Sequence, residues 1–218
     1  MNFLLLMAYV NLDLQVHSGG RVYSTYRVAS PQYLVFDTET NGGTDQRCIE
    51  LAYIVFDYDF AELYRYKSYW KLPAFVSINV YAQNVHGISE EVLRNHGLDP
   101  RQGLEQFYEW VDRIASCGGV VVAHNAAFDA NVINRTSRMN GIARTFTKEE
   151  CFCTMQRSVQ YEGCKNKRGQ QRNPKNSELY EILHGTFPTW AKLHSALDDV
   201  RVTAMNFHNG RKRGWWNV

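Results

Sequence analysis

The central pattern of this chain is an apolar run that ends in two acidic residues. Four apolar residues at positions 33–36 lead directly into Asp37, Thr38, Glu39 and Thr40. An apolar run bounded by polar residues is typical of a buried strand, and residues two apart in a strand point to the same side. The pattern therefore predicts a strand over about 33–37, with the carboxylates of Asp37 and Glu39 side by side at its end.

Patterns on both sides of this strand predict its neighbours. Strands are expected at 49–56 and 61–69, and the short links between the three strands favour antiparallel pairing. Upstream, apolar residues alternate with polar ones on either side of a turn at 17–20, which predicts a β-hairpin. We assign residues 1–32 to an N-terminal β-hairpin extension and residues 33–218 to the main domain.

The second half of the chain alternates between helical and strand patterns. A helical period predicts a helix over 102–115, and β-branched residues predict a buried strand over 120–123. The remaining predicted elements are a helix at 128–140, a short strand near 151–154 with a helix continuing through Tyr161, a helix at 178–183, and a last helix that carries His194 and Asp199. This order predicts an α/β fold with a mixed central sheet, whose first three strands are antiparallel, and helices on both faces.

Composition and charge narrow the class of protein. The chain is 44% hydrophobic and 21% charged, which favours a packed core over disorder. The net charge of +2 gives no overall attraction to nucleic acid, so any basic surface is local. Five cysteines without framework spacing indicate reduced thiols in a cytoplasmic protein, and the partner spacing of a zinc site is missing. Neither a signal peptide nor a membrane-spanning stretch is predicted.

Two carboxylates side by side need a compensating charge. Two anions 4 Å apart repel by about 1 kcal/mol in water and by about four times as much near a protein surface. A divalent cation between Asp37 and Glu39 turns this repulsion into attraction, and oxygen donors favour Mg²⁺ or Mn²⁺. The same Asp-x-Glu spacing also occurs in solvated loops, so the metal hypothesis depends on acidic residues elsewhere in the chain.

Two later segments supply those acidic residues. Asp129 comes just after the strand at 120–123, at the start of a helix, where a carboxylate also serves as a cap. His194 and Asp199 lie five residues apart at the start of the last helical pattern. Asp198 lies one position before Asp199 and points about 100° away from it on a helix, so we expect Asp198 to lie outside a metal cluster.

Three motifs taken together resemble those of the DEDDh 3′→5′ exonucleases, the DnaQ-like group. The motifs are Asp37-Thr-Glu39, His124-Asn-Ala-Ala-Phe-Asp129 and His194-Ser-Ala-Leu-Asp-Asp199, and they occur in the family's order. The segment Asn84-Val-His86-Gly-Ile88 is a supporting match. The resemblance covers about residues 33–210 and implies an RNase H-like fold.

The resemblance also implies a reaction and the residues that perform it. Family members hydrolyse phosphodiester bonds from the 3′ end and release nucleoside 5′-monophosphates with two Mg²⁺ ions, for which Mn²⁺ can substitute. By resemblance, Asp37, Glu39, Asp129 and Asp199 are metal ligands, and Asp37 bridges the two ions. His194 resembles the general base that removes a proton from water.

Other residues are expected to contact nucleic acid. Those expected from the family motifs are Thr38, Thr40, His86, Asn125 and Phe128, and those expected from a basic loop at 163–176 are Lys165, Lys167 and Arg168. The alternative for this loop is a solvated surface segment without a binding role, and the sequence does not decide between the two. Gly43 stands where many family members carry a bulky apolar residue that separates the last two bases. Trp215 and Trp216 in the tail either stack on bases or pack on the core, and we favour packing.

Several alternatives stay open at the level of sequence. The expected partner is nucleic acid with a free 3′ end, single-stranded by expectation, but DNA and RNA are not distinguished because no residue is identifiable as a reader of the 2′-hydroxyl. A polymerase is a candidate partner in a proofreading role. The alternative function is a non-catalytic nucleic-acid-binding module, although such a module is expected to have lost at least one ligand and none is lost.

Overall fold

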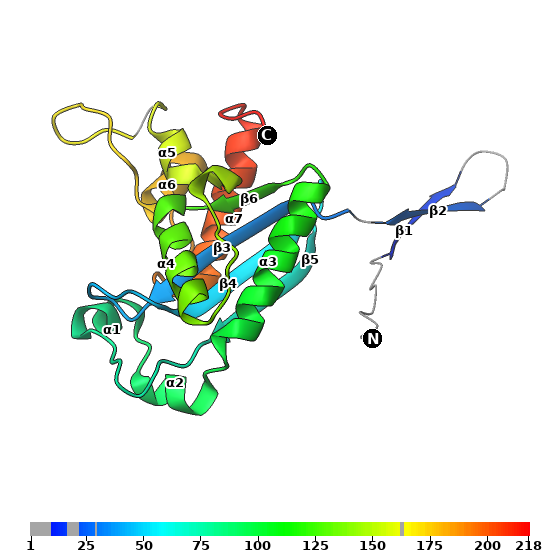
Figure 1. Cartoon of the computed structure of the whole chain (residues 1–218). Helices are drawn as coiled ribbons and strands as arrows, with labels where there is room; N and C mark the ends of the chain where they lie inside the picture. Colours follow the sequence, from blue (N-terminus) through cyan, green and yellow to red (C-terminus); the bar gives the residue numbers. More distant parts are fainter. Residues whose placement is uncertain (1–9, 17–21, 29, 162–163) are drawn as a thin grey trace, which may run out of the picture.

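A five-stranded mixed sheet forms the centre of the protein (Figure 1). The computed structural model describes residues 10–16, 22–28, 30–161 and 164–218. The strand order is β5-β4-β3-β6-β7. Their bounds are Tyr33–Thr40 for β3, Cys48–Phe56 for β4, Glu62–Tyr69 for β5, Val120–Ala123 for β6 and Cys151–Cys153 for β7.

The pairing of the strands confirms the predicted topology. β4 pairs antiparallel with both β3 and β5, whereas β6 is parallel to both β3 and β7. Every residue of β4 is buried, because this strand lies inside the sheet with helices on both faces. β3 is longer than predicted and continues past the apolar run through Thr40, so Asp37 and Glu39 belong to the strand itself.

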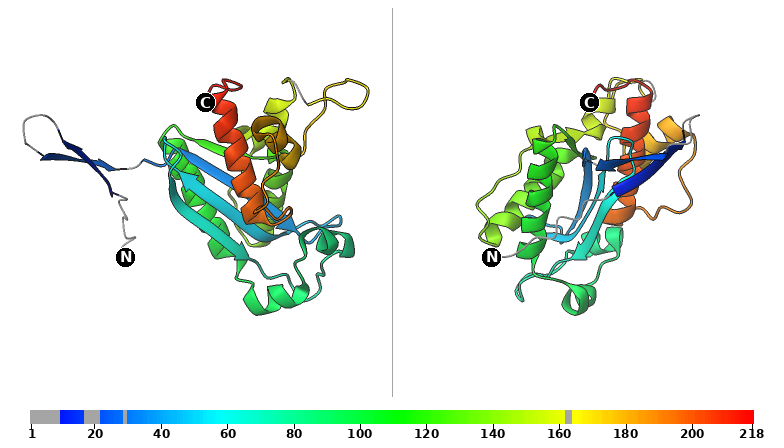
Figure 2. Two further views of the ribbon diagram at one scale, coloured as in Figure 1. Left: turned by 180° about the vertical axis from the view of Figure 1, so that it is seen from behind. Right: turned by 90° about the vertical axis from the view of Figure 1, so that its right-hand side faces the viewer.

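Helices cover both faces of the sheet (Figures 1 and 2). α3 (Pro100–Ser116) and α4 (Ala126–Met139) lie on one face, and α7 (Ala196–Lys212) lies on the other. α6 (Asn176–His184) packs against α7. The even-numbered apolar residues of β3, such as Phe36, join the core under α3 and α4, and the odd-numbered ones, such as Val35, join the core under α7.

Short helices complete the domain around the sheet. α1 (Val80–His86), α2 (Glu90–His96) and α5 (Thr154–Ser158) are single short elements, and a 3₁₀ turn covers Lys148–Glu150. The Ser89 side chain accepts a hydrogen bond from the backbone N–H of Val92 and thereby caps α2. α1 was not predicted, because its seven residues carry no clear helical period.

The helix boundaries differ from the predictions at two places. α5 ends at Ser158 rather than continuing through Tyr161. The last helix begins at Ala196, so the prediction that this helix carries His194 is wrong. His194 has a φ of 62°, in the left-handed region that a right-handed helix excludes, and it therefore belongs to the loop before α7.

The N-terminal strands pair as predicted. β1 (Val10–Val16) and β2 (Val22–Val28) form a separate antiparallel two-stranded sheet. The predicted turn at 17–20 lies outside the described residues. None of the helices in the described ranges combines the length and the apolar character needed to cross a bilayer.

The aromatic tail packs on the core rather than projecting from it. Trp216 is 7% exposed, and its indole Nε1–H donates to the carbonyl of Phe207 at 3.2 Å. Trp215 stacks on Tyr161 with ring centroids 4.2 Å apart. Gly210 provides the space, because a Cβ there would lie 2.0 Å from the Trp216 ring. Of the two readings of the tail, packing is therefore the one confirmed.

This packing predicts that Trp216→Ala destabilises the whole domain. Removal of a buried tryptophan side chain leaves a cavity under α7, and we expect the free energy of unfolding to fall by about 3–5 kcal/mol. Urea denaturation measures this change. Trp190→Ala is the control, because Trp190 is 48% exposed and its removal should cost far less. Equal losses for the two variants would contradict the packing role of Trp216.

Candidate active site

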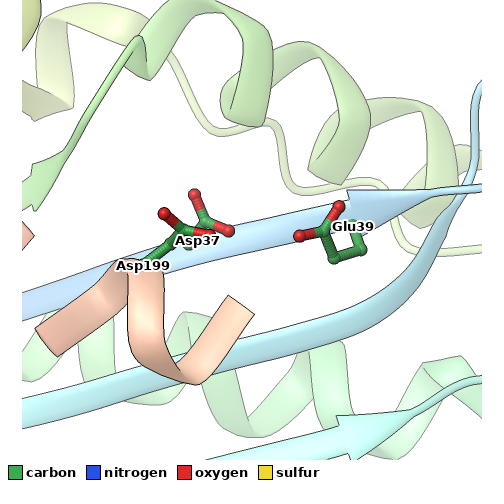
Figure 3. Close-up of side chains that lie close together, drawn as sticks. All are labelled: Asp37, Glu39 and Asp199. Carbon is green, nitrogen blue, oxygen red and sulfur yellow. The ribbon is translucent and has the colours of Figure 1, made fainter. Parts of the chain in front are cut away.

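Three carboxylates from distant parts of the chain converge at the end of β3 (Figure 3). Asp37 and Glu39 project from β3 toward α7, and Asp199 projects from the first turn of α7. One carboxylate oxygen from each residue lies within 4.8 Å of the others. The alternation along β3 explains the geometry, because odd-numbered residues of this strand face α7.

Asp129 lies beside this cluster and is held there through Thr38. Asp129 belongs to the first turn of α4 and is 2% exposed. Its Oδ1 accepts hydrogen bonds from the backbone N–H of Thr38 at 3.2 Å and from its hydroxyl at 2.8 Å. In the described part of the chain the three-carboxylate group does not include Asp129, so its role as a metal ligand stays a prediction.

Burial and mutual repulsion raise the pKa of every carboxyl group in the site. Burial, followed by the charge of Asp199, raises the pKa of Glu39 to about 8. Burial raises the pKa of Asp129 to about 7, although its bonds with Thr38 oppose the shift. The pKa of Asp37 is raised well above its usual range by burial and then by Asp129, and burial also raises the pKa of Asp199. Without a cation, Glu39 therefore retains its proton near neutral pH, and the other three groups lose theirs at a higher pH than ordinary carboxyl groups do.

This donor set fits a hard divalent cation. All of its ligand atoms are carboxylate oxygens, which suit Mg²⁺ or Mn²⁺, and no softer donor belongs to the group among the described residues. A cation would favour the charged form of these carboxylates and so oppose the burial and the repulsion that raise their pKa values.

His194 borders the cluster from the loop before α7. Its imidazole is exposed, and its backbone N–H donates to Asp199 Oδ2 at 2.9 Å. This bond holds the left-handed backbone of His194 in place and orients the carboxylate of Asp199. Asp198 lies outside the cluster as predicted, because it pairs with Arg201 at 3.0 Å and accepts a hydrogen bond from the backbone N–H of Lys192.

Of the residues expected to contact substrate, Thr40 and His86 form hydrogen bonds with the backbone of the protein, whereas no such bond is described for the side chains of Asn125 and Phe128. The hydroxyl of Thr40 accepts from the backbone N–H of Gly42. His86 lies 3.2 Å through Nε2 from the carbonyl of Thr40, and its Nδ1 accepts from the backbone N–H of Ile88. Burial lowers the pKa of His86. Both nitrogens of this neutral ring are therefore occupied by backbone groups, and we expect His86 to hold the turn after β3.

The side chains of Asn125 and Phe128 do not have the backbone hydrogen bonds that hold Thr40 and His86. Asn125 adopts a left-handed conformation, with φ 73° and ψ 47°, at the start of α4, and its side chain makes no capping bond there. Phe128 is 37% exposed. Phe128 is thus exposed and Asn125 partly buried, and their contact with substrate stays a prediction.

The basic loop is an ordered turn rather than a featureless coil. Asn166 Oδ1 accepts from the backbone N–H groups of Arg168 and Gln170, and Lys165 forms a bridge with Gln171. The side chains of Lys165, Lys167 and Arg168 are exposed, and no acidic partner pairs with them within the described residues. The turn therefore presents three uncompensated cations.

The end of this loop is tied to the acidic cluster. His124 Nε2 lies 3.1 Å from the carbonyl of Pro174, and its Nδ1 lies 3.0 Å from the hydroxyl of Thr154. Burial lowers the pKa of His124 to about 4, so the ring is neutral and serves as a structural link. Asn176 Nδ2 donates to the carbonyl of Asp199 at 3.2 Å. Sequence reasoning missed Asn176, because no local signal marks this contact.

The raised pKa values predict that the cation-free protein loses stability as pH rises. Glu39 and Asp129 have folded-state pKa values of about 8 and about 7, whereas carboxyl groups titrate near about 4 in unfolded chains. Between these limits the folded state binds more protons than the unfolded state, so the free energy of unfolding falls as pH increases. We expect a lower Tm at pH 8 than at pH 5.5 in EDTA, and a smaller difference in Mg²⁺.

Asp37→Asn tests the origin of this effect, because it removes one of the buried carboxyl groups whose pKa is raised. We expect this variant to show a weaker pH dependence in EDTA than the wild type. Asp198→Asn is the matched control, since Asp198 is paired with Arg201 outside the cluster. A Tm in EDTA that rises between pH 5.5 and pH 8 would contradict the explanation.

Solved structures share the fold of this chain at low sequence identity. Escherichia coli exonuclease I in complex with a dA16 oligonucleotide has a TM-score of 0.65 at 17% identity, and the match covers 83% of this chain and 41% of that chain. Cell-death related nuclease 4 (CRN-4) has a TM-score of 0.66 at 15% identity, with 84% and 64% covered. The 3′-exonuclease that recognises the histone mRNA stem-loop has a TM-score of 0.67 at 10% identity, with 85% and 65% covered.

The sequence comparisons identify the family. The chain spans about two-fifths of the length of the exonuclease I chain it matches, since 41% of that chain is covered. No curated protein sequence is significantly similar to it. Residues 34–207 match the sequence profile of the RNase T exonuclease family, which covers the sheet and the residues of the acidic cluster. The chain therefore belongs to this family of DnaQ-like 3′→5′ exonucleases and has their RNase H-like fold.

Proposed function

We propose that this chain is a metal-dependent exonuclease that removes nucleoside 5′-monophosphates from the 3′ end of a nucleic acid. The observation that carries the proposal is the convergence of Asp37, Glu39 and Asp199 within 4.8 Å, with His194 at the edge of the group. Hydrolysis of a phosphodiester requires an oriented water, a group that accepts its proton and compensation of the phosphate charge. The site offers residues for each task.

The four carboxylates would bind the divalent cations. Asp37, Glu39 and Asp199 supply the convergent oxygens, and Asp129 is positioned beside them by Thr38. Two Mg²⁺ ions, or Mn²⁺ in their place, would neutralise charge on the phosphate and make water more acidic. The basis for two ions rather than one is the presence of four carboxylates and the family's motifs.

His194 acts as the general base. Its exposed imidazole is attached to a backbone that is fixed by the hydrogen bond to Asp199 Oδ2 at 2.9 Å. The residue that holds cations thus also positions the base, and the proton leaves the attacking water for the imidazole.

The proposed substrate is a single strand with a free 3′ end. The structurally similar exonuclease I is bound to dA16, and the similar 3′-exonuclease recognises an RNA stem-loop. The partly buried Asn125 and the exposed Phe128 would contact the terminal nucleotide, and the turn that carries Lys165, Lys167 and Arg168 would contact phosphates further along. Digestion of single- and double-stranded DNA and RNA in parallel, each labelled at either end, determines the substrate class.

The setting of the enzyme in the cell is a separate part of the proposal. All five cysteines are free, which suits a reducing compartment, and we place the protein in the cytoplasm. A proofreading role would add a polymerase as partner, and co-purification from the native host tests this. A non-catalytic nucleic-acid-binding module is the alternative, with binding but no Mg²⁺-dependent cleavage as its signature.

The role of His194 predicts a large loss of activity in His194→Asn. Asparagine tolerates the left-handed backbone at this position but does not serve as a base. We expect kcat on a 3′-labelled oligonucleotide to fall about 10²–10⁴-fold, as is typical for loss of a general base, while Tm and Mg²⁺ affinity change little. Asp37→Ala should also be inactive, because it removes a cation ligand.

His96→Asn is the matched control for this experiment. His96 is an exposed histidine in the last turn of α2, so the same substitution there should leave kcat unchanged. If His194→Asn and Asp37→Ala both degraded the oligonucleotide as fast as the wild type, the proposed mechanism would be wrong.

The basic turn predicts a change in the salt dependence of binding. Replacement of Lys165, Lys167 and Arg168 by alanine removes three phosphate contacts, and we expect the slope of log K against log salt to become shallower by about 2 for single strands. The control replaces the exposed residues Arg65, Arg113 and Lys148, which changes the net charge equally. The same slope for both triple variants would contradict a role for the basic turn.

A further inference from the structure

Glu50 is a buried carboxylate that lies next to the acidic cluster but is not one of its ligands. It is 1% exposed, and it interrupts the apolar sequence of β4. In the register of the sheet it lies directly opposite Glu39. Among the described residues, the group that could hold a cation contains Glu39 but not Glu50. Its carboxylate is directed instead to the start of α7.

The contact between Glu50 and α7 replaces a local helix cap. Oε2 of Glu50 accepts a hydrogen bond from the backbone N–H of Ala196, the first residue of α7, at 3.1 Å. Ser195 occupies the N-cap position, but its side chain makes no capping bond. The first N–H groups of a helix lack partners within the helix and carry partial positive charge. A carboxylate from β4 therefore supplies the missing acceptor.

Lys67 compensates the charge of Glu50. Its ammonium lies 2.9 Å from Glu50 Oε1, and the lysine side chain is 33% exposed against 2% for that of the glutamate. A buried carboxylate without a partner is costly, particularly beside Asp37 and Glu39. With Lys67 from β5 in place, the pair that holds α7 carries no net charge, although the carboxylate of Glu50 still contributes to the raised pKa of Glu39.

Ala196, whose backbone Glu50 binds, lies in the sequence between His194 and Asp199. Ala196 follows His194 by two positions and precedes Asp199 by three, and the bond from His194 N–H to Asp199 Oδ2 closes this turn. We propose that Glu50 is a positioning residue, which sets His194 and Asp199 against the carboxylates of β3. The inference rests on the proposed function, and a displacement of about 1 Å in such a site can cost about 100-fold in rate.

Two double variants separate the acceptor from the charge. Glu50→Gln/Lys67→Met keeps an oxygen for the N–H of Ala196 and removes both charges. Glu50→Met/Lys67→Met also removes both charges and has a side chain of similar size, but it lacks the acceptor. We expect the glutamine variant to retain kcat within about threefold of the wild type, and the methionine variant to lose about 10–100-fold with KM for the oligonucleotide within about twofold.

Hydrogen exchange of the Ala196 amide gives a readout that does not depend on activity. We expect about tenfold faster exchange in the methionine double variant than in the glutamine one, and weaker Mg²⁺ binding by calorimetry. Equal kcat losses in the two variants, or an Ala196 amide that stays equally protected in both, would overturn the proposal. If the wild type shows no Mg²⁺-dependent cleavage, the proposed function fails, and the exchange experiment still decides the role of Glu50.

Glu150→Met is the matched control. Glu150 also accepts a hydrogen bond from a backbone N–H, that of Thr147 at 2.8 Å, and pairs with a basic residue, Arg144, at 3.0 Å. Glu150 lies away from the cluster. It precedes Cys151, which pairs with Val121, and Val121 pairs with Leu34 near the start of β3, whereas the cluster lies near the end of β3. This variant should keep the kcat of the wild type for each folded molecule. A loss of kcat as large as that of Glu50→Met/Lys67→Met would overturn the proposal.

Discussion

Repulsion between carboxylates in a poorly solvated site is the constraint on which the rest of the structure depends. Asp37, Glu39 and Asp199 lie within 4.8 Å of one another, and burial raises the pKa of each. Packing of α7 on one face and of α4 on the other keeps these groups together despite the repulsion. Burial and crowding of these carboxylates destabilise the cation-free fold, and a cation bound between them would stabilise the fold by offsetting that unfavourable energy.

β3 organises this arrangement because its two sets of side chains face different layers. Asp37 and Glu39 point to the side of α7, where they meet Asp199. Thr38 lies between them in sequence and binds Asp129 of α4 instead. One strand thus collects acidic residues from both helical layers of the domain, and neither layer alone forms the complete set.

The sequence predicts those parts of the fold that depend on the pattern of neighbouring residues, and it does not predict those that depend on contacts between distant residues. The apolar run of β3, the alternating elements after it and the side-by-side placement of Asp37 and Glu39 follow from periodicity, and the structure has them. The left-handed backbone of His194 and the use of both nitrogens of His86 depend on partners far away in the chain. A glutamate inside an apolar strand is a visible anomaly at Glu50, but its partner, the backbone of Ala196, carries no side-chain signal.

The position of α7 in the chain has a consequence for synthesis. Asp199 is supplied by the last helix of the described chain, and that helix is secured by Trp216, which packs against Gly210 near the end of the sequence. A ribosome makes the β3 carboxylates before it makes this helix. The nascent chain therefore brings Asp37 and Glu39 together with Asp199 only after α7 and the Trp216 segment that secures it have been synthesised.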